Sequence, residues 1–261
     1  MRMMRFPLRL TADLTMARLA QELRLSRGVR PVQFVDAAEI LHPDSSHPVS
    51  HEKIRDIIGS RSPVIWIGGS EPLCHPGIAH LVRAITQSGH FVFLETAGTF
   101  LRRRIHEFQP VSRLFLTVRL ESGAPRAASS GLRPGASELA VEGIRAARLS
   151  GFLICVHVHV TPETEMSEVA DLFQLADSLD LDGCVISSVR GESNSALPAV
   201  QALSQKTAEA RKRIGSIWWE SFSRLVEPVL LREPGSQPPT GTSEVHLEHK
   251  ARADEEGIKF A

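Results

Sequence analysis

The stretch of sequence that decides the fold runs from Ile65 to Pro76 and reads IWIGGSEPLCHP. It begins inside a short apolar run, Val64–Ile67, of the kind found in buried parallel strands. Two glycines follow, and glycine is used where a backbone must turn sharply or approach a ligand closely. Glu71 and Pro72 then open a helix, because proline is pre-set for the first helical position and a helix N-terminus can hold a polar ligand. The stretch therefore predicts a buried strand, a glycine turn and a helix start at which a ligand can bind.

Strands and helices alternate along most of the remaining chain. A half-buried strand is expected at Phe6–Ala12, where apolar and polar residues alternate, and Thr15 can cap a helix at Met16–Ser26. A short additional strand is expected at Val32–Val35. The other expected strands are Val64–Ile67, Phe91–Leu94, Arg113–Leu120, Phe152–Val160 and Leu181–Ser187. The other expected helices follow Ser50 or span Ile78–Ser88, Thr99–Phe108, Ser137–Ser150, Thr164–Ser178 and Pro198 to about Leu231. Six β/α units predict an α/β fold with a parallel sheet, curled into a partial TIM-like barrel rather than a full eight-fold one.

The composition predicts one domain followed by a tail. A chain of 261 residues is long enough to bury a large core. From Glu233 onward the sequence is rich in Pro, Gly, Ser, Thr and charged residues, which cannot bury enough surface to offset their ordering entropy. We therefore expect a domain at residues 1–231 and a disordered tail at residues 232–261.

Charge and hydropathy exclude several classes of function. The 30 Lys and Arg residues balance the 30 Asp and Glu residues, which argues against a nucleic-acid partner. No apolar run approaches the roughly 20 residues needed to span a membrane, and Met1–Phe6 is not followed by the apolar segment of a signal peptide. The three cysteines are far apart and odd in number, which is typical of the reducing cytoplasm and of a chain without a disulfide framework. We expect a cytoplasmic protein.

Four motifs, in order, resemble those of the radical S-adenosylmethionine (SAM) superfamily. Gly68–Pro72 resembles its glycine-glycine-glutamate-proline motif, and Phe91–Thr99 is similar to its third strand. Leu116–Ser122 is similar to the fourth strand, and Glu138–Phe152 matches the usual helix, glycine, phenylalanine and strand step. The resemblance covers Pro7–Arg190 and implies a partial (β/α)6 barrel of the radical SAM type.

The resemblance also implies where SAM would bind. In the family the glutamate of the glycine-rich motif holds the amino group of SAM, which gives Glu71 that role here. The alternative is that Glu71 only caps a helix start, at the positive end of the helix dipole. The residues implied in SAM binding are Gly68, Gly69, Ser70, Glu71, Pro72, Thr96, Arg119 and Glu121.

The cluster motif of the family is missing from the sequence. Family members bind a four-iron cluster (4Fe-4S) through three cysteines spaced C-x-x-x-C-x-x-C after the first strand, and this chain has no such triplet. If Phe6–Ala12 is the first strand, the three cysteines correspond to Ala17, Gln21 and Arg24. None of these side chains can replace a thiolate ligand of iron. We therefore expect no 4Fe-4S cluster and no cluster-dependent radical chemistry.

A second candidate site lies on the strand Phe152–Val160. Cys155, His157 and His159 alternate with valines, so their side chains share one face of the strand. Zinc or iron would accept these ligands, with Glu163 or Glu165 nearby. The alternative is a half-polar strand whose histidines only satisfy hydrogen bonds.

Two functions remain open from the sequence, which does not decide whether the chain is an enzyme. The first is a non-radical pseudoenzyme that pairs with a cluster-bearing radical SAM homologue or another protein subunit, with SAM binding retained or lost. The second is an enzyme on the same scaffold that uses SAM without a radical, or a metal held by Cys155, His157 and His159.

Overall fold

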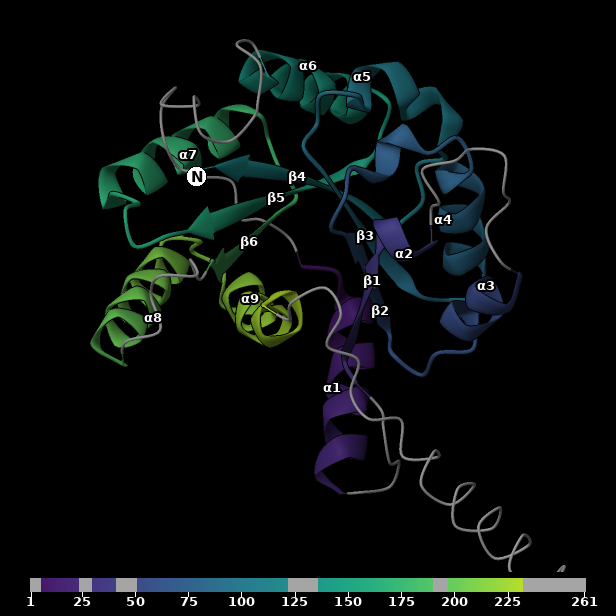
Figure 1. Ribbon diagram of the computed structural model, residues 1–261, viewed down its shortest axis with the longest axis horizontal. Helices are drawn as coiled ribbons and strands as arrows, with labels where there is room; N and C mark the ends of the chain where they lie inside the picture. The colour runs from purple at the N-terminus through teal and green to yellow at the C-terminus, as the bar shows by residue number, and fades with distance from the viewer. Residues whose placement is uncertain (1–5, 24–29, 41–50, 122–135, 190–196, 232–261) are drawn as a thin grey trace, which may run out of the picture. The chain divides into compact units, whose positions relative to one another are not determined.

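Six parallel strands form one curled sheet, and their order in the sheet is their order in the chain (Figure 1). The strands are β1 (Val32–Asp36), β2 (Val64–Gly68), β3 (Phe91–Thr96), β4 (Leu114–Glu121), β5 (Leu153–Val160) and β6 (Gly183–Ser188). The computed structural model describes residues 6–23, 30–40, 51–121, 136–189 and 197–231. Within this part of the chain the predicted α/β partial barrel is confirmed.

Helices surround the sheet on its outer side and close its open side. They are α1 (Leu8–Glu22), α2 (Ala37–Ile40), α3 (His51–Ile58), α4 (Ile78–Gln87), α5 (Leu101–Arg104), α6 (Ala136–Leu149), α7 (Met166–Ser178), α8 (Leu197–Lys212) and α9 (Ile217–Leu230), with short 3-10 turns η1 (Pro72–Cys74) and η2 (Ile105–Glu107). Helices α4 to α7 lie along the outer face of the curled sheet in Figure 1. Helix α9 packs against both β6 and β1, so it fills the gap that a complete barrel would close with further strands.

The first predicted strand is wrong. Residues 8–12 of the expected strand Phe6–Ala12 begin helix α1 instead. The buried residues Leu10, Leu14 and Ala17 recur at the spacing of one helix face, and burying this face outweighs the short alternation that precedes it. The first strand of the sheet is therefore β1, which was expected only as a short additional strand.

The remaining elements agree closely with the sequence. The other predicted strands lie within two residues of those observed. The expected helix from Pro198 to about Leu231 is two helices, α8 and α9, because the chain turns between them at Gly215, which has a φ of 68°. Such a φ is accessible to glycine at little cost.

An aromatic layer fills one end of the inner face of the sheet. Trp66 stacks on Phe93 with ring centroids 5.4 Å apart, and Phe93 stacks on Phe115 at 4.7 Å. From α9, Trp219 packs edge-on against this row. A Cβ atom on Gly183 of β6 would lie 2.2 Å from the Trp219 ring, so only glycine lets α9 approach so closely.

The expected tail at residues 232–261 lies outside the described residues. The chain divides into a unit Met1–Leu231 and a unit Arg232–Ala261, and the description here concerns the first. Among the described helices, none combines the length and the apolar character required to cross a lipid bilayer.

Candidate functional site

Polar side chains replace the aromatic layer toward the C-terminal ends of the strands. Side chains alternate between the two faces of a strand, so Glu95 on β3 follows Phe93 on the inner face. In register beside it lie Thr117 on β4 and Cys155 on β5, and the next pair along these two strands is Arg119 and His157. The C-terminal ends of barrel strands are where active sites are built, which makes this polar end the candidate functional site.

Glu95 is the centre of this site. Its carboxylate is buried, and Oε2 accepts a hydrogen bond of 2.9 Å from the indole N–H of Trp66. Oε1 lies 3.0 Å from Nδ1 of His157 and 3.9 Å from Nη1 of Arg119. Burial by itself would raise the pKa of Glu95, but the charge and hydrogen bond of His157 and the Trp66 bond lower this pKa to about 2. The carboxylate is therefore ionised at neutral pH.

Two histidines from β5 complete the group. His157 is buried, and its Nε2 lies 2.8 Å from the hydroxyl of Ser187 on β6. Nε2 of His159 lies 3.3 Å from Nδ1 of His157 and 3.9 Å from Oε1 of Glu95. Burial and the neighbouring His157 lower the pKa of His159 to about 3, so His159 is neutral at pH 7.

Cys155 does not join the histidines as predicted. Its thiol is fully buried and contacts the carbonyl of Val156, and burial raises its pKa well above the ordinary value. Glu163 and Glu165 are exposed, and Glu165 caps helix α7. The group of potential metal ligands found in the described part of the chain is Glu95, His157 and His159. One feature of the sequence could have identified Glu95. It is the acidic residue directly after the apolar run Phe91–Leu94, and it lies on the same face of the strand as Phe93.

The structure explains why the turn after β2 contains two glycines, Gly68 and Gly69. Gly68 ends β2, and a Cβ atom there would lie 2.6 Å from Oε2 of Glu95. Gly69 has a φ of 83°, and a Cβ atom there would lie 2.4 Å from Oδ1 of Asp36. Both positions therefore require glycine, the first because the Glu95 carboxylate passes beside it and the second because of its backbone conformation.

Glu71 fastens this turn to the end of β3. Oε1 accepts hydrogen bonds from the hydroxyl of Thr96 at 2.7 Å and from the N–H of Leu73 at 3.1 Å. Oε2 accepts a bond of 2.8 Å from the N–H of Ala97. The predicted cap is therefore present at the start of η1, and the other bonds of Glu71 join two neighbouring loops. Its role in SAM binding stays a prediction.

The other residues implied in SAM binding lie around the same strand ends. Gly69 and Ser70 are exposed, whereas Pro72 and Thr96 are buried. The side chain of Arg119 is 31% exposed and sits beside Glu95. Glu121 ends β4, and its side chain lies outside the described residues.

The positions assigned to the cluster cysteines do not follow the first strand of the sheet. Ala17 and Gln21 lie on helix α1, ahead of β1, and Arg24 lies outside the described residues. Strand β1 ends at Asp36, so the segment that follows the first strand begins at Ala37. The sequence from residue 37 to residue 63 contains no cysteine. The alignment of individual positions was therefore wrong, while the absence of a cysteine triplet from the sequence stands.

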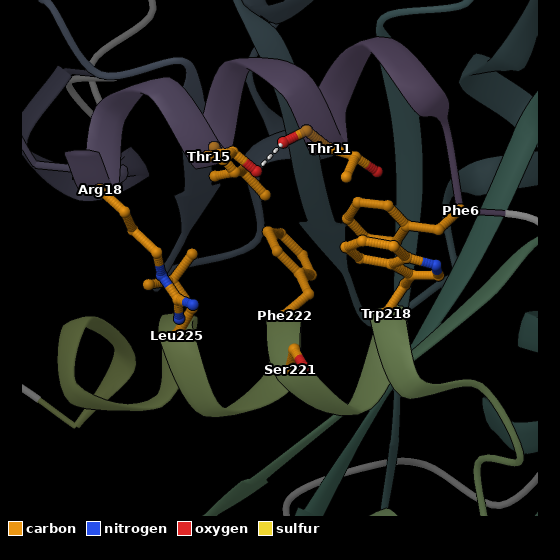
Figure 2. Close-up of a pocket in the computed structure, with 9 residues that line it drawn as sticks. Phe6, Thr11, Thr15, Arg18, Trp218, Ser221, Phe222 and Leu225 are labelled. Carbon is orange, nitrogen blue, oxygen red and sulfur yellow. Dashed lines mark hydrogen bonds between the residues drawn. The ribbon is translucent and has the colours of Figure 1, made fainter. Parts of the chain in front are cut away.

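A separate apolar pocket lies between α1 and α9 (Figure 2). Phe6 and Trp218 stack at one end of it, with ring centroids 6.5 Å apart, and Arg18 lies at the other end. Several large apolar side chains of the same two helices, and Leu23 directly after α1, are exposed; those on the helices are Leu8, Met16, Leu19, Ile217 and Trp218.

Comparisons with known proteins match the larger part of the chain. A family model described as the Radical SAM superfamily matches residues 18–176, which is more than half of the chain. The curated AdoMet-dependent heme synthase of Methanosarcina barkeri is 27% identical over 150 residues, covering 56% of this chain and 40% of that protein. This chain therefore spans less than half the length of that relative.

Solved structures show the same fold. Streptococcus suis SuiB bound to its precursor peptide SuiA superposes with a TM-score of 0.51 and 10% identity, over 76% of this chain and 50% of that chain. SuiB bound to S-adenosylmethionine gives a TM-score of 0.49 and 10% identity, over 78% and 59% of the two chains. At 10% identity, the similarity to the peptide-bound SuiB structure shows a shared fold and nothing more.

Proposed function

This chain belongs to the radical SAM superfamily, and from that premise we propose that it is a member without cluster-dependent radical chemistry. In this proposal it acts as the partner subunit of a cluster-bearing radical SAM enzyme and keeps a SAM-binding end of the barrel. The activity and partners of the whole protein are part of the proposal, because the chain covers less than half of its curated relative.

The distribution of cysteines carries this proposal. A 4Fe-4S cluster needs thiolate ligands, and the segment after β1 supplies none. Cys155 and Cys184 are buried, and burial raises the pKa of both thiols. Cys74 is exposed but stands alone. The donor set of this chain therefore does not fit the cluster of its family.

SAM itself fits the residues better than the cluster does. Its methionine carboxylate is an anion, and the partly exposed guanidinium of Arg119 can bind it. The exposed backbone of Gly69 and Ser70 lies at the same end of the sheet and offers polar groups to the amino group. SAM would lack the bonds that a cluster supplies, so we expect weaker binding than in a cluster-bearing member. Membership of the radical SAM superfamily supports this part of the proposal.

The exposed apolar surface of α1 and α9 supports a protein partner. Leu19 is 43% exposed and Trp218 is 53% exposed, on the two helices that border the pocket of Figure 2. A contiguous exposed apolar patch is characteristic of protein interaction sites, and in this proposal the exposed side chains of the two helices form one. The aromatic side chain is of the type that dominates binding energy at such sites.

The partner role is tested by complex formation. The full chain is co-expressed with a cluster-bearing radical SAM homologue of the same organism, and the mass of the complex is measured by light scattering during size-exclusion chromatography. We expect a complex for the wild type and for Leu149→Glu, a control on α6 where Leu149 is 91% exposed. The double variant Leu19→Glu, Trp218→Glu is expected to elute alone. A wild type that elutes alone, or a double variant that binds equally well, would contradict the partner role.

A second candidate function, a non-radical enzyme on the same scaffold, is favoured by the group formed by Glu95, His157 and His159. In this second candidate function the third metal ligand is Glu95 rather than the predicted Cys155.

A further inference from the structure

We propose that Glu95, His157 and His159 form a binding site for a divalent transition-metal ion, of which zinc is the best match. Within the described ranges, these are the three His, Cys, Asp or Glu residues whose potential ligand atoms all lie within 4.8 Å of one another. The inference does not depend on the partner role proposed above, because it concerns only what this chain binds.

The spacing of the three ligand atoms suits a tetrahedral ion. Nδ1 of His157 lies 3.0 Å from Oε1 of Glu95 and 3.3 Å from Nε2 of His159, and the third side of the triangle is 3.9 Å. Ligands about 2.1 Å from a tetrahedral zinc ion lie about 3.4 Å from one another. The average side of the observed triangle has this length, so an ion can reach all three atoms with little movement of the side chains.

Three atoms that can donate lone pairs to a cation lie within 4.8 Å of one another. In the metal-free protein a proton on Nδ1 of His157 can satisfy the contact with the Glu95 carboxylate, and Nε2 can then accept from the hydroxyl of Ser187. When Zn²⁺ binds, the ring proton moves to Nε2, which then donates to the hydroxyl of Ser187, and the lone pair of Nδ1 is donated to the ion. The exchange changes no oxidation state and needs no other reactant.

The donor set selects the kind of ion. Two imidazoles with one carboxylate are a combination found in zinc sites and in non-haem iron(II) sites. Calcium and magnesium prefer oxygen ligands, so they match it poorly. We infer zinc because the spacing of the three ligand atoms matches a four-coordinate tetrahedral ion, the geometry that zinc takes in proteins.

The surroundings hold the ligands in place. The hydroxyl of Ser187 lies 2.8 Å from Nε2 of His157 and can accept the ring proton there, which leaves Nδ1 to face the ion. The indole N–H of Trp66 fixes the Glu95 carboxylate through Oε2, which leaves Oε1 to face the ion. Trp66 lies on β2 and Ser187 on β6, so the ligands on β3 and β5 are held by the strands that flank them.

The site also has a side that faces solvent. The side chain of His159 is 24% exposed and that of Arg119 is 31% exposed. Three protein ligands with a further position for water or substrate are the pattern of catalytic zinc sites. The positive charge of Arg119, 3.9 Å from Oε1 of Glu95, favours an anion in that position.

The test is titration of Zn²⁺ into the metal-free full chain, produced without a polyhistidine tag and followed by calorimetry. We expect one ion per chain. His159→Ala is expected to weaken binding by more than about a hundredfold, since even loss of a group that orients a ligand costs 10–100-fold. Ser187→Ala is expected to weaken it by about 10–100-fold. His80→Ala, which removes an exposed histidine of α4, is the matched control and should bind as the wild type does.

Further measurements separate a loss of metal binding from a loss of folding. Circular dichroism shows whether each variant is folded, and Zn²⁺ should raise the melting temperature of the wild type and of His80→Ala but not of His159→Ala. Co²⁺ in place of Zn²⁺ should give the intense visible bands of a four-coordinate ion. A wild type that takes up no Zn²⁺, or a folded His159→Ala that binds it as tightly as the wild type, would overturn the inference.

Discussion

At the scale of single residues, two carboxylates organise the strand ends. Glu71 accepts three hydrogen bonds that join the turn after β2 to the end of β3. Glu95 lies below it on the inner face and joins β3 to β2 and β5 through Trp66 and His157. The Glu71 carboxylate therefore stabilises a loop, whereas the Glu95 carboxylate lies at the centre of the polar side chains of the candidate site.

Replacing Glu71 by alanine should destabilise the fold by about 2 kcal/mol, since a hydrogen bond to a charged group contributes roughly 1.5–3 kcal/mol and this site is partly exposed. Glu71→Gln should have a smaller effect, because its amide oxygen still accepts two of the bonds. Urea unfolding measures both. The exposed Glu163→Ala is the control, with an expected change within about 0.5 kcal/mol. Equal stability of Glu71→Ala and Glu163→Ala would show that the turn does not need its carboxylate.

The sequence predicted the glycine turn but only two of the three members of the polar group. Gly68, Gly69 and Glu71 form one continuous motif, so local patterns were sufficient to find them. His157 and His159 were found because they alternate on one strand. Glu95 was missed as their partner because it is 62 residues from His157, and the contact depends on how the sheet curls.

At the scale of elements, hydrogen bonds and an ion pair of Glu227 connect the helices α8 and α9 to the last strand, β6. Oε1 of Glu227 on α9 accepts from the N–H of Ser188 at 3.0 Å and from its hydroxyl at 2.8 Å. Oε2 lies 2.7 Å from Nη2 of Arg211 on α8, whose side chain is almost fully buried. One carboxylate thus joins α8, α9 and β6.

This carboxylate should make stability depend on pH. Burial would raise the pKa of Glu227, but the bonds from Arg211 and Ser188 hold it below the ordinary value of 4.5. Because the folded-state pKa is the lower one, the stabilisation is complete above the ordinary pKa and is lost as pH falls through the folded value.

The urea midpoint of the wild type should therefore fall more steeply below about pH 4.5 than that of Glu227→Gln, which cannot titrate at this position. The control is Glu142→Gln, because the ion pair of Glu142 with Arg102 is exposed and should leave the wild-type slope unchanged. If the urea midpoints of the wild type and Glu227→Gln depended on pH in the same way, this role of Glu227 would be contradicted.

Elements were predictable where their patterns were long or strongly apolar. Phe91–Thr96 is buried throughout and was identified by its apolar run. Helix α1 was mistaken at its start for a strand, because Phe6, Leu8, Leu10 and Ala12 alternate over a length too short to separate the two periods. The error displaced the expected cluster loop from the segment after β1 to the helix before it.

At the scale of the whole molecule, the alternation of strands and helices was enough to predict the partial barrel. Its six strands run in chain order, which the connection rules for parallel sheets favour. The way in which α9 closes the open side could not be predicted, because it depends on the close contact of Trp219 with Gly183. The family follows from the motifs, while the function depends on which of the family's ligands this chain has kept.

The most direct test of the account is reconstitution of the full chain with iron and sulfide under anaerobic conditions, followed by measurement of bound iron and of reductive SAM cleavage. Cys74→Ser is the control, because of the three cysteines Cys74 is the exposed one and can bind iron non-specifically. We predict much less than four iron ions per chain in the wild type, with the iron that Cys74 holds non-specifically missing from the control, and no cleavage of SAM in either. A wild type that binds a full four-iron cluster and cleaves SAM would contradict the central claim that this member of the family has lost its radical chemistry.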